Sequence, residues 1–211
     1  LVTIKSKKEI EQMKEACRIT GLLYREIEKV IRPGMTTLEL DRYAEQVIRK
    51  NGGVPAQKGY PSGVKGVPNF PATLCVSIND EVIHGIPSSK TVLHDGDVVS
   101  IDCVVWKDGF HGDAARTFLV GKGSDEDKKL IEVTKQAFFE GIKYARAGRH
   151  LHEISGAIDA YCTKHGYGVV RDLVGHGIGT SLHEEPQIPN FRQWRKGIKL
   201  RAGMTLAIEP M

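Results

Sequence analysis

The chain has 211 residues, with 30 Lys or Arg against 26 Asp or Glu, which gives a formal net charge of +4. Hydrophobic residues make up 40% and charged residues 27%, a composition that excludes disordered, collagen-like and coiled-coil proteins. The small basic excess is not by itself the signature of a nucleic-acid-binding protein. No apolar signal segment or membrane-spanning run is visible, and four cysteines without a CxxC pair favour a reducing cytoplasm.

Two helices are predicted in the first fifty residues. A capping-box pattern opens the first helix at Ser6, and Pro33 ends it. The same pattern opens the second helix at Thr36, and Asn51 followed by glycine ends it. After a Gly- and Pro-rich stretch at 59–71, β-rich runs cover residues 74–78, 98–106 and 116–120.

A similar order of elements recurs in the second half of the chain. Helical patterns at 124–147 and 154–165 precede strand-like runs at 168–172 and 204–208. This repetition predicts an α+β fold of two helix-helix-strand halves, with helices over one face of a shared antiparallel sheet. We expect a single domain over 1–211 with pseudo-repeats at about 6–120 and 124–211. Chance similarity between helical patterns is the alternative explanation.

Asp108-Gly109 predicts a two-residue hairpin turn between two β-rich runs. Paired positions would then sum to 217, so Asp113 faces Val104 and Asp102 lies two residues along the same face. The two carboxylates would lie diagonally, with Cα atoms ~7–8 Å apart. Two carboxylates among apolar strand residues repel each other, and cations between them relieve that repulsion. A pair of solvated aspartates at a sheet edge is the alternative.

Further metal-ligand types follow late in the sequence. His176 lies between glycines that allow close backbone approach, and we expect its imidazole to be exposed on a tight turn. Glu209 follows an apolar run, where we expect it on one strand face with Thr205 and Ala207. Carboxylates with one imidazole suit Mn, Fe, Co or Zn, and two such ions bind a hydroxide and polarise a carbonyl. A core histidine and a surface glutamate are the alternatives for His176 and Glu209 taken singly.

Several motifs then resemble type I methionine aminopeptidases. They are Ser-Ile-Asn-Asp-Glu-Val-Ile-His-Gly-Ile-Pro at 77–87, two aspartates eleven residues apart, Gly-His-Gly-Ile-Gly at 175–179, Leu-His-Glu-Glu-Pro-Gln-Ile at 182–188 and Gly-Met-Thr-Leu-Ala-Ile-Glu-Pro-Met at 203–211. The resemblance runs from Ile4 to Met211. It implies the pita-bread fold, itself a pseudo-two-fold duplication, and removal of the N-terminal methionine from chains with a small second residue.

The resemblance also implies roles for individual residues. The implied ligands of two divalent ions are Asp102, Asp113, His176 and Glu209. His84, which by itself reads as a surface histidine, would contact the substrate near the scissile amide. His183 would hydrogen-bond the scissile carbonyl and the oxyanion, and Glu209 would handle the proton of the attacking water. The implied lining of the methionine pocket is Cys75, with Tyr60, Phe70 and Leu182 as neighbours.

The expected partner is the N-terminal methionine of nascent peptides in the cytoplasm, with ribosome contact, a monomeric chain, no specific nucleic acid and no membrane. The family carries a fifth ligand, a bridging glutamate, on a strand beyond the Ile-Glu-Pro-Met motif, together with a pocket tryptophan. The sequence ends at Met211. We therefore expect a C-terminally shortened chain with weak binding of the second ion and low activity.

Other functions fit part of the same pattern. An Xaa-Pro dipeptidase shares the ligand types and a similar Gly-His plus His-Glu-x-Pro pattern, but such enzymes usually carry an added N-terminal domain. Type II methionine aminopeptidases have a long insertion between the positions of His176 and Glu209, and the spacing here argues against it. A non-catalytic pita-bread module that binds peptides is the remaining alternative, although such modules typically lose metal carboxylates.

Overall fold

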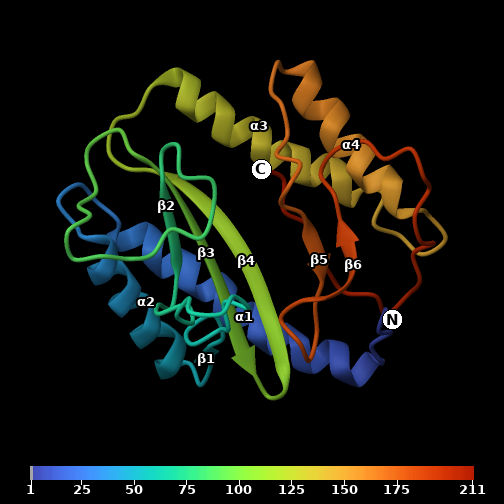
Figure 1. Ribbon diagram of the computed structural model, residues 1–211, viewed down its shortest axis with the longest axis horizontal. Helices are drawn as coiled ribbons and strands as arrows, with labels where there is room; N and C mark the ends of the chain where they lie inside the picture. Colours follow the sequence, from blue (N-terminus) through green and yellow to red (C-terminus); the bar gives the residue numbers. More distant parts are fainter. Residues whose placement is uncertain (1) are drawn as a thin grey trace. The chain divides into compact units, whose positions relative to one another are not determined.

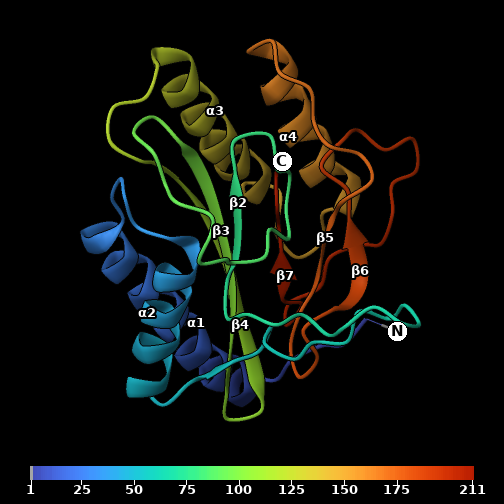
Figure 2. The ribbon, with the colours of Figure 1, turned by 60° about the vertical axis from the view of Figure 1, so that its left-hand side comes forward.

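The computed structural model describes residues 2–211, and their arrangement is shown in Figures 1 and 2. The chain forms two compact units. The first, called here the 11–127 unit, comprises Glu11–Asp127. The second, called the 128–211 unit, comprises Lys128–Met211 together with the N-terminal segment through Ile10. None of the described helices is both long and apolar enough to cross a membrane.

The elements from the N-terminus to the middle of the chain are α1 (Lys7–Val30), α2 (Thr37–Lys50), β1 (Val54–Pro55), β2 (Cys75–Ile78), β3 (Val98–Lys107) and β4 (Phe110–Leu119). The strand β3 is central: β1 and β2 pair antiparallel with its two ends on one side, and β4 pairs along its whole length on the other. Helices α1 and α2 lie side by side against this sheet (Figure 2).

Both predicted capping boxes are present. The Glu9 carboxylate accepts the Ser6 N–H at 2.7 Å, and the Ser6 hydroxyl accepts the Glu9 N–H at 3.3 Å. Thr36 and Glu39 make the same reciprocal pair at the start of α2. These bonds satisfy N–H groups that a helix start leaves unpaired, which is why the sequence pattern located both starts correctly.

The core of the 11–127 unit lies between its helices and its sheet. Alternate β3 residues Ile101, Cys103 and Val105 are fully buried against apolar side chains of α1 and α2. The Tyr24 hydroxyl of α1 donates to the Ile101 carbonyl at 3.0 Å. Because side chains alternate along a strand, this packing turns Asp102 and Val104 to the opposite face of the sheet.

The remaining elements are α3 (Asp125–Ile142), α4 (Leu151–Lys164), β5 (Gly175–Gly177), β6 (Glu184–Ile188) and β7 (Leu206–Ala207). They form a second antiparallel sheet in the order β6-β5-β7, and Figure 2 shows β7 beside β5. Ile154 and Ile158 of α4 pack with Ile188 of β6 in its core. The helix-helix-strand order of the two halves is therefore as predicted, but hydrogen bonding groups the strands into two sheets rather than one shared sheet.

Two strand predictions in the second half need correction. Residues 168–172 form no strand, although the Val170 N–H donates to the Met211 carbonyl at 2.8 Å. The strand predicted at 204–208 is reduced to Leu206–Ala207, so Thr205 and Glu209 lie just outside it. A short apolar run in the sequence does not specify which segment it will pair with. A segment becomes a β-strand only when its backbone hydrogen-bonds to a neighbouring strand.

Candidate metal centre

The hairpin of β3 and β4 carries the first two predicted ligands. Its two turn residues, Asp108 and Gly109, have φ angles of 49° and 90°, and the strands pair Val104 with Asp113 and Asp102 with Ala115. Paired positions therefore sum to 217, as predicted. Asp102 and Asp113 lie on the same face of the hairpin, opposite the face that packs against the helices, and both are half-buried.

A buried amide holds one oxygen of Asp102. Gln57 Nε2 donates to Asp102 Oδ2 at 2.9 Å and lies 3.5 Å from the Sγ atom of Cys75. Cys75 is itself directly opposite Asp102 in the pairing of β2 with β3. Burial raises the pKa of the Cys75 thiol, and the nearby charges of Asp102 and Asp113 raise it further. Cys75 is therefore a neutral thiol at pH 7, which is compatible with apolar surroundings.

Of the other predicted pocket residues, Tyr60 and Phe70 lie in the 11–127 unit and Leu182 lies in the 128–211 unit. Tyr60 and Phe70 are brought together by a 2.9 Å bond from the Phe70 N–H to the Tyr60 carbonyl. A further bond from the Tyr60 N–H to the Gln57 carbonyl, also 2.9 Å, connects them to Gln57, whose side chain contacts Cys75. Leu182 is buried in the 128–211 unit, next to His183 in sequence.

His84 lies in the segment that follows β2 and is exposed, with a φ of 61°. The segment folds back onto β2, where the Val76 N–H donates to the Gly85 carbonyl at 2.9 Å. A Cβ at Gly85 would lie 2.0 Å from the Val76 carbonyl oxygen, so only glycine permits this return. Desolvation lowers the pKa of His84, so its imidazole is neutral at pH 7.

His176 is on the middle strand of the second sheet, and the predicted tight turn is wrong. A Cβ at Gly175 would meet the Ala207 carbonyl oxygen at 2.3 Å, and one at Gly177 would meet the Glu185 carbonyl oxygen at 2.1 Å. The two glycines thus let β7 and β6 close in on either side of β5. The prediction that the flanking glycines allow close backbone approach is correct. The segments that approach are the neighbouring strands, and the His176 side chain is only 12% exposed.

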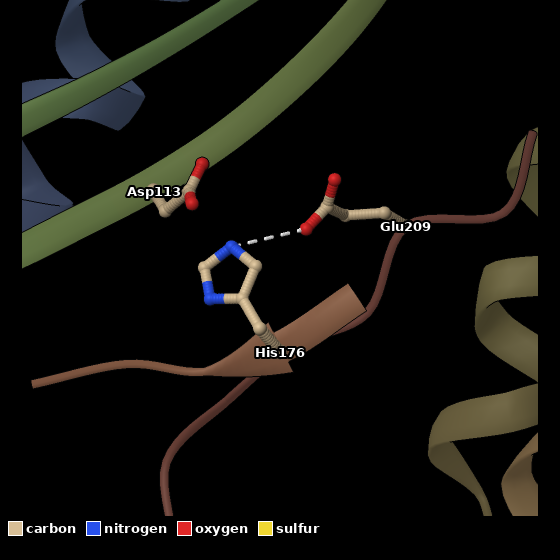
Figure 3. A group of neighbouring side chains, drawn as sticks. All are labelled: Asp113, His176 and Glu209. Atoms are coloured by element: carbon tan, nitrogen blue, oxygen red, sulfur yellow. Dashed lines mark ion pairs between the residues drawn. The ribbon is translucent and has the colours of Figure 1, made fainter. Parts of the chain in front are cut away.

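Pairing across the second sheet brings His176 to Glu209. His176 faces Ala207 of β7, and Glu209 is two residues further along the chain. Figure 3 shows the two side chains pointing toward each other, with His176 Nε2 3.3 Å from Glu209 Oε1. His176 Nδ1 lies 2.7 Å from the Gly177 carbonyl oxygen.

This geometry fits a cation. A proton on Nδ1, donated to the Gly177 carbonyl, leaves the lone pair on Nε2, which then faces a carboxylate oxygen. Two acceptors at that distance need a positive group between them, either a proton on Nε2 or a metal ion. An imidazole whose Nδ1–H is tied to a carbonyl is the usual arrangement for a metal-ligating histidine.

His183 lies next to His176, on a turn that its neighbours hold in place. The His183 ring packs edge-on against the His176 ring with centroids 4.4 Å apart. The next residue, Glu184, forms a buried ion pair with Lys5 at 2.5 Å and also accepts the Ser181 N–H at 3.2 Å. The turn that carries His183 is therefore fixed by residues on both sides of it.

Three residues that no sequence motif predicted hold predicted ligands or their neighbours in place. Gln57 reaches Asp102, Lys5 pairs with Glu184, and the fully buried Asn190 donates to the Glu209 main-chain carbonyl at 2.6 Å. None of the three lies at a recognisable spacing from its partner. The only signal in the sequence was a polar residue beside an apolar run, and such a residue does not indicate which group it will contact.

Known proteins match the chain throughout its length. Residues 11–211 match metallopeptidase family M24. The chain is 50% identical to the methionine aminopeptidase of Clostridium acetobutylicum and 46% identical to methionine aminopeptidase 1 of Bacillus subtilis, covering all of this chain and 82% of each relative.

Solved structures give the same result for the fold. The methionine aminopeptidase of Thermotoga maritima matches with a TM-score of 0.94 and 40% identity, over all of this chain and 82% of that one. The prolidase of Pyrococcus furiosus matches with a TM-score of 0.82 at 24% identity, over 98% of this chain and 57% of that one, which bears on the fold alone. The predicted pita-bread fold is thus confirmed. Because the family match covers almost the whole chain, the protein belongs to metallopeptidase family M24, and it uses a divalent metal ion as that family does.

Proposed function

We propose that the protein is a metal-dependent aminopeptidase that removes the N-terminal methionine from peptides with a small second residue. The observation that carries this proposal is identity of 46–50% over the whole chain to relatives named methionine aminopeptidase. The motifs on which the resemblance rests are all present, including both histidines, His84 and His183.

We propose that Asp113, His176 and Glu209, the side chains drawn in Figure 3, would hold one divalent ion, and that Asp102 and Asp113 would hold a second. The carboxylates and the imidazole are donors that suit Mn, Fe, Co or Zn. The His176–Glu209 pairing and the common face of Asp102 and Asp113 support this assignment.

The bound ions would supply Lewis acidity, lowering the pKa of water and polarising the scissile carbonyl. The protein then has three tasks. Glu209 accepts the proton of the attacking water and delivers it to the leaving amine. His183 donates a hydrogen bond to the oxygen on which negative charge develops. His84, neutral at pH 7, contacts the substrate near the scissile amide.

The methionine side chain would bind beside Cys75, with Tyr60, Phe70 and Leu182 as neighbours. The raised pKa of the Cys75 thiol supports this, because an uncharged, buried sulfur is compatible with an apolar thioether. A charged thiolate there would oppose both the apolar substrate and the carboxylates of the hairpin.

The substrate suggests where the enzyme works. We propose that it acts as a monomer in the cytoplasm on chains still at the ribosome, where an N-terminal methionine first emerges. All four cysteines are free thiols, as a reducing compartment favours. Exposed basic side chains on the loop after β6 offer a surface for ribosomal phosphates: Arg192, Arg195, Lys196 and Lys199.

The decisive experiment replaces Asp113 with Asn and measures bound Mn²⁺ and the hydrolysis of Met-Ala-Ser. Loss of a direct ligand should exceed the 10–100-fold loss of metal affinity typical of outer hydrogen-bond partners. Asp80→Asn, an exposed aspartate in the same unit, is the control and should change neither quantity. Unchanged metal content in Asp113→Asn would refute the proposed metal site. Faster turnover of Ala-Pro than of Met-Ala-Ser by the wild-type protein would assign the Xaa-Pro dipeptidase function instead.

A further inference from the structure

Gln57 lies where the chain leaves β1 and runs alongside β3. The Ala56 N–H donates to the Val104 carbonyl at 2.9 Å, which continues the antiparallel pairing of β1 by one more bond. The Gln57 side chain then accepts the Val104 N–H through Oε1 at 3.3 Å. Main chain and side chain thus both fix Gln57 against β3, and the residue is only 8% exposed.

The three polar contacts of the side-chain amide define its orientation. Nε2 faces Asp102 Oδ2 at 2.9 Å and Cys75 Sγ at 3.5 Å, while Oε1 faces the Val104 N–H. A flipped amide would place Oε1 against the carboxylate and Nε2 against an N–H group. Both contacts would be repulsive, so only one orientation is compatible with the surroundings.

We propose that Gln57 is the positioning residue of Asp102, whose amide holds the carboxylate in the orientation that binds a metal ion. This inference rests on the proposed function, in which Asp102 is a ligand. A long cationic side chain could hold the carboxylate equally well, but its charge would repel the metal. The neutral amide orients the ligand without that repulsion, and it connects the ligand to Cys75 in the wall of the pocket.

Two variants separate positioning from packing. Gln57→Glu keeps an oxygen that can accept the Val104 N–H but removes the donor to Asp102. Gln57→Met keeps the length of the side chain and removes both. We expect both variants to bind Mn²⁺ about 10- to 100-fold more weakly in calorimetric titration of the chelator-stripped protein. Hydrolysis of Met-Ala-Ser should fall at limiting Mn²⁺ and recover when Mn²⁺ is raised.

Thr37→Val is the matched control. Thr37 is buried in the same unit, and its hydroxyl donates to the Ser88 carbonyl and accepts the Ser88 N–H, far in sequence from Asp102. Its loss removes buried hydrogen bonds of the same kind. We expect a lower melting temperature for the metal-free control with Mn²⁺ affinity equal to that of wild type.

The outcomes are distinct. Wild-type or tighter Mn²⁺ binding by Gln57→Glu, with weakening only in Gln57→Met, would overturn the proposal, because the Val104 contact or packing would then be the cause. Failure of activity to recover at high Mn²⁺ would overturn it also. Asp102→Asn is the reference variant. If it binds Mn²⁺ like wild type, the proposed metal site itself is refuted. If it loses Mn²⁺ affinity and the Gln57 variants do not, only the role of Gln57 is refuted.

Discussion

At the scale of single residues, neutral amides contact two of the acidic residues that we assign to the metal site, one at its carboxylate and one at its main chain. Gln57 donates to the Asp102 carboxylate, and Asn190 donates to the main-chain carbonyl of Glu209. Both amides are buried. A ligand whose carboxylate or backbone is already held in place loses less conformational freedom on binding a cation, so such residues affect metal affinity without touching the metal.

Asn190→Ala should therefore lower Mn²⁺ affinity and the turnover of Met-Ala-Ser, because Glu209 loses the bond that fixes its backbone. Removing one buried hydrogen bond should also lower the free energy of unfolding by about 1 kcal/mol. Calorimetric titration with Mn²⁺ and urea denaturation measure the two effects.

Gln193→Ala is the control for Asn190. Gln193 lies on the same loop as Asn190, and its side-chain amide also donates to a main-chain carbonyl, that of Phe191 at 3.2 Å. It does not reach Glu209, so we expect wild-type metal affinity. Equal loss of affinity in the two variants would show that the loop as a whole, and not Asn190, supports the site.

At the scale of elements, the position of the β3–β4 hairpin depends on one close approach. A Cβ at Gly112 would lie 2.4 Å from the Cys17 N atom and 2.5 Å from the Ala16 carbonyl carbon, both in the backbone of α1. The Thr20 hydroxyl of α1 also donates to the Gly112 carbonyl at 2.9 Å. Gly112 thus sets how closely α1 packs on the strand that carries Asp113.

Gly112→Ala should force the hairpin and α1 apart and lower the free energy of unfolding by about 1–3 kcal/mol, the usual range for overpacking. It should also weaken Mn²⁺ binding, because the displaced residue precedes Asp113. Gly156→Ala in α4 is the control: nothing lies within 4 Å of its added Cβ, so alanine should stabilise that helix by up to about 1 kcal/mol. Urea denaturation compares the two, and similar effects would contradict the packing argument.

The capping box of α2 gives a second prediction at this scale. Thr36→Ala removes the side chain that accepts the Glu39 N–H and should lower the free energy of unfolding by about 1 kcal/mol. Thr134→Ala is the matched control, because Thr134 lies inside α3 and its hydroxyl donates only to the preceding turn, at Leu130. We expect no loss of stability there, and a loss equal to that of Thr36→Ala would contradict the cap.

At the scale of the whole chain, contacts between its two ends build the 128–211 unit. Lys5 and Glu184 pair at 2.5 Å, with side chains 6% and 8% exposed, and the Lys5 N–H donates to the Gly203 carbonyl at 2.8 Å. Burial alone would raise the pKa of Glu184. The hydrogen bonds from Lys5, Thr3 and the Ser181 N–H outweigh it and hold the pKa below its ordinary value.

Glu184→Gln should lower the free energy of unfolding by about 3 kcal/mol at pH 7, because it leaves a buried ammonium without its counter-charge. A carboxylate with a lowered pKa stabilises the fold above its unfolded pKa, about 4.3, and loses that contribution as pH falls through the folded pKa. The difference between wild type and variant should therefore shrink from pH 7 toward pH 3. Urea denaturation at both pH values measures it, and an equal difference at both would contradict the ion pair.

Glu11→Gln serves as the control for Glu184. Glu11 pairs with Lys14 on the exposed face of α1, where solvent screens the charges. We expect little change in stability at either pH.

Much of the candidate site could be predicted from local signals. The Asp108-Gly109 turn sets the register of the hairpin, and that register places Asp102 and Asp113 on one face because side chains alternate along each strand. The position of His176 was harder to predict. Its flanking glycines were compatible with a turn or with a tightly packed middle strand, and the neighbours that decide between them lie elsewhere in the chain.

The sequence by itself determined the starts of α1 and α2, the hairpin register and, through its motifs, the family and the acidic and histidine residues that we assign to the metal site. These depend on residues within a few positions of one another or on an ordered set of patterns. Only the tertiary structure decided which side chains hold those residues, and the turn that carries His183, in place. Gln57 and Asp102 are 45 positions apart, Asn190 and Glu209 are 19 apart, and Lys5 and Glu184 are 179 apart. Contacts over such separations form when strands and helices pack, and no local pattern encodes them.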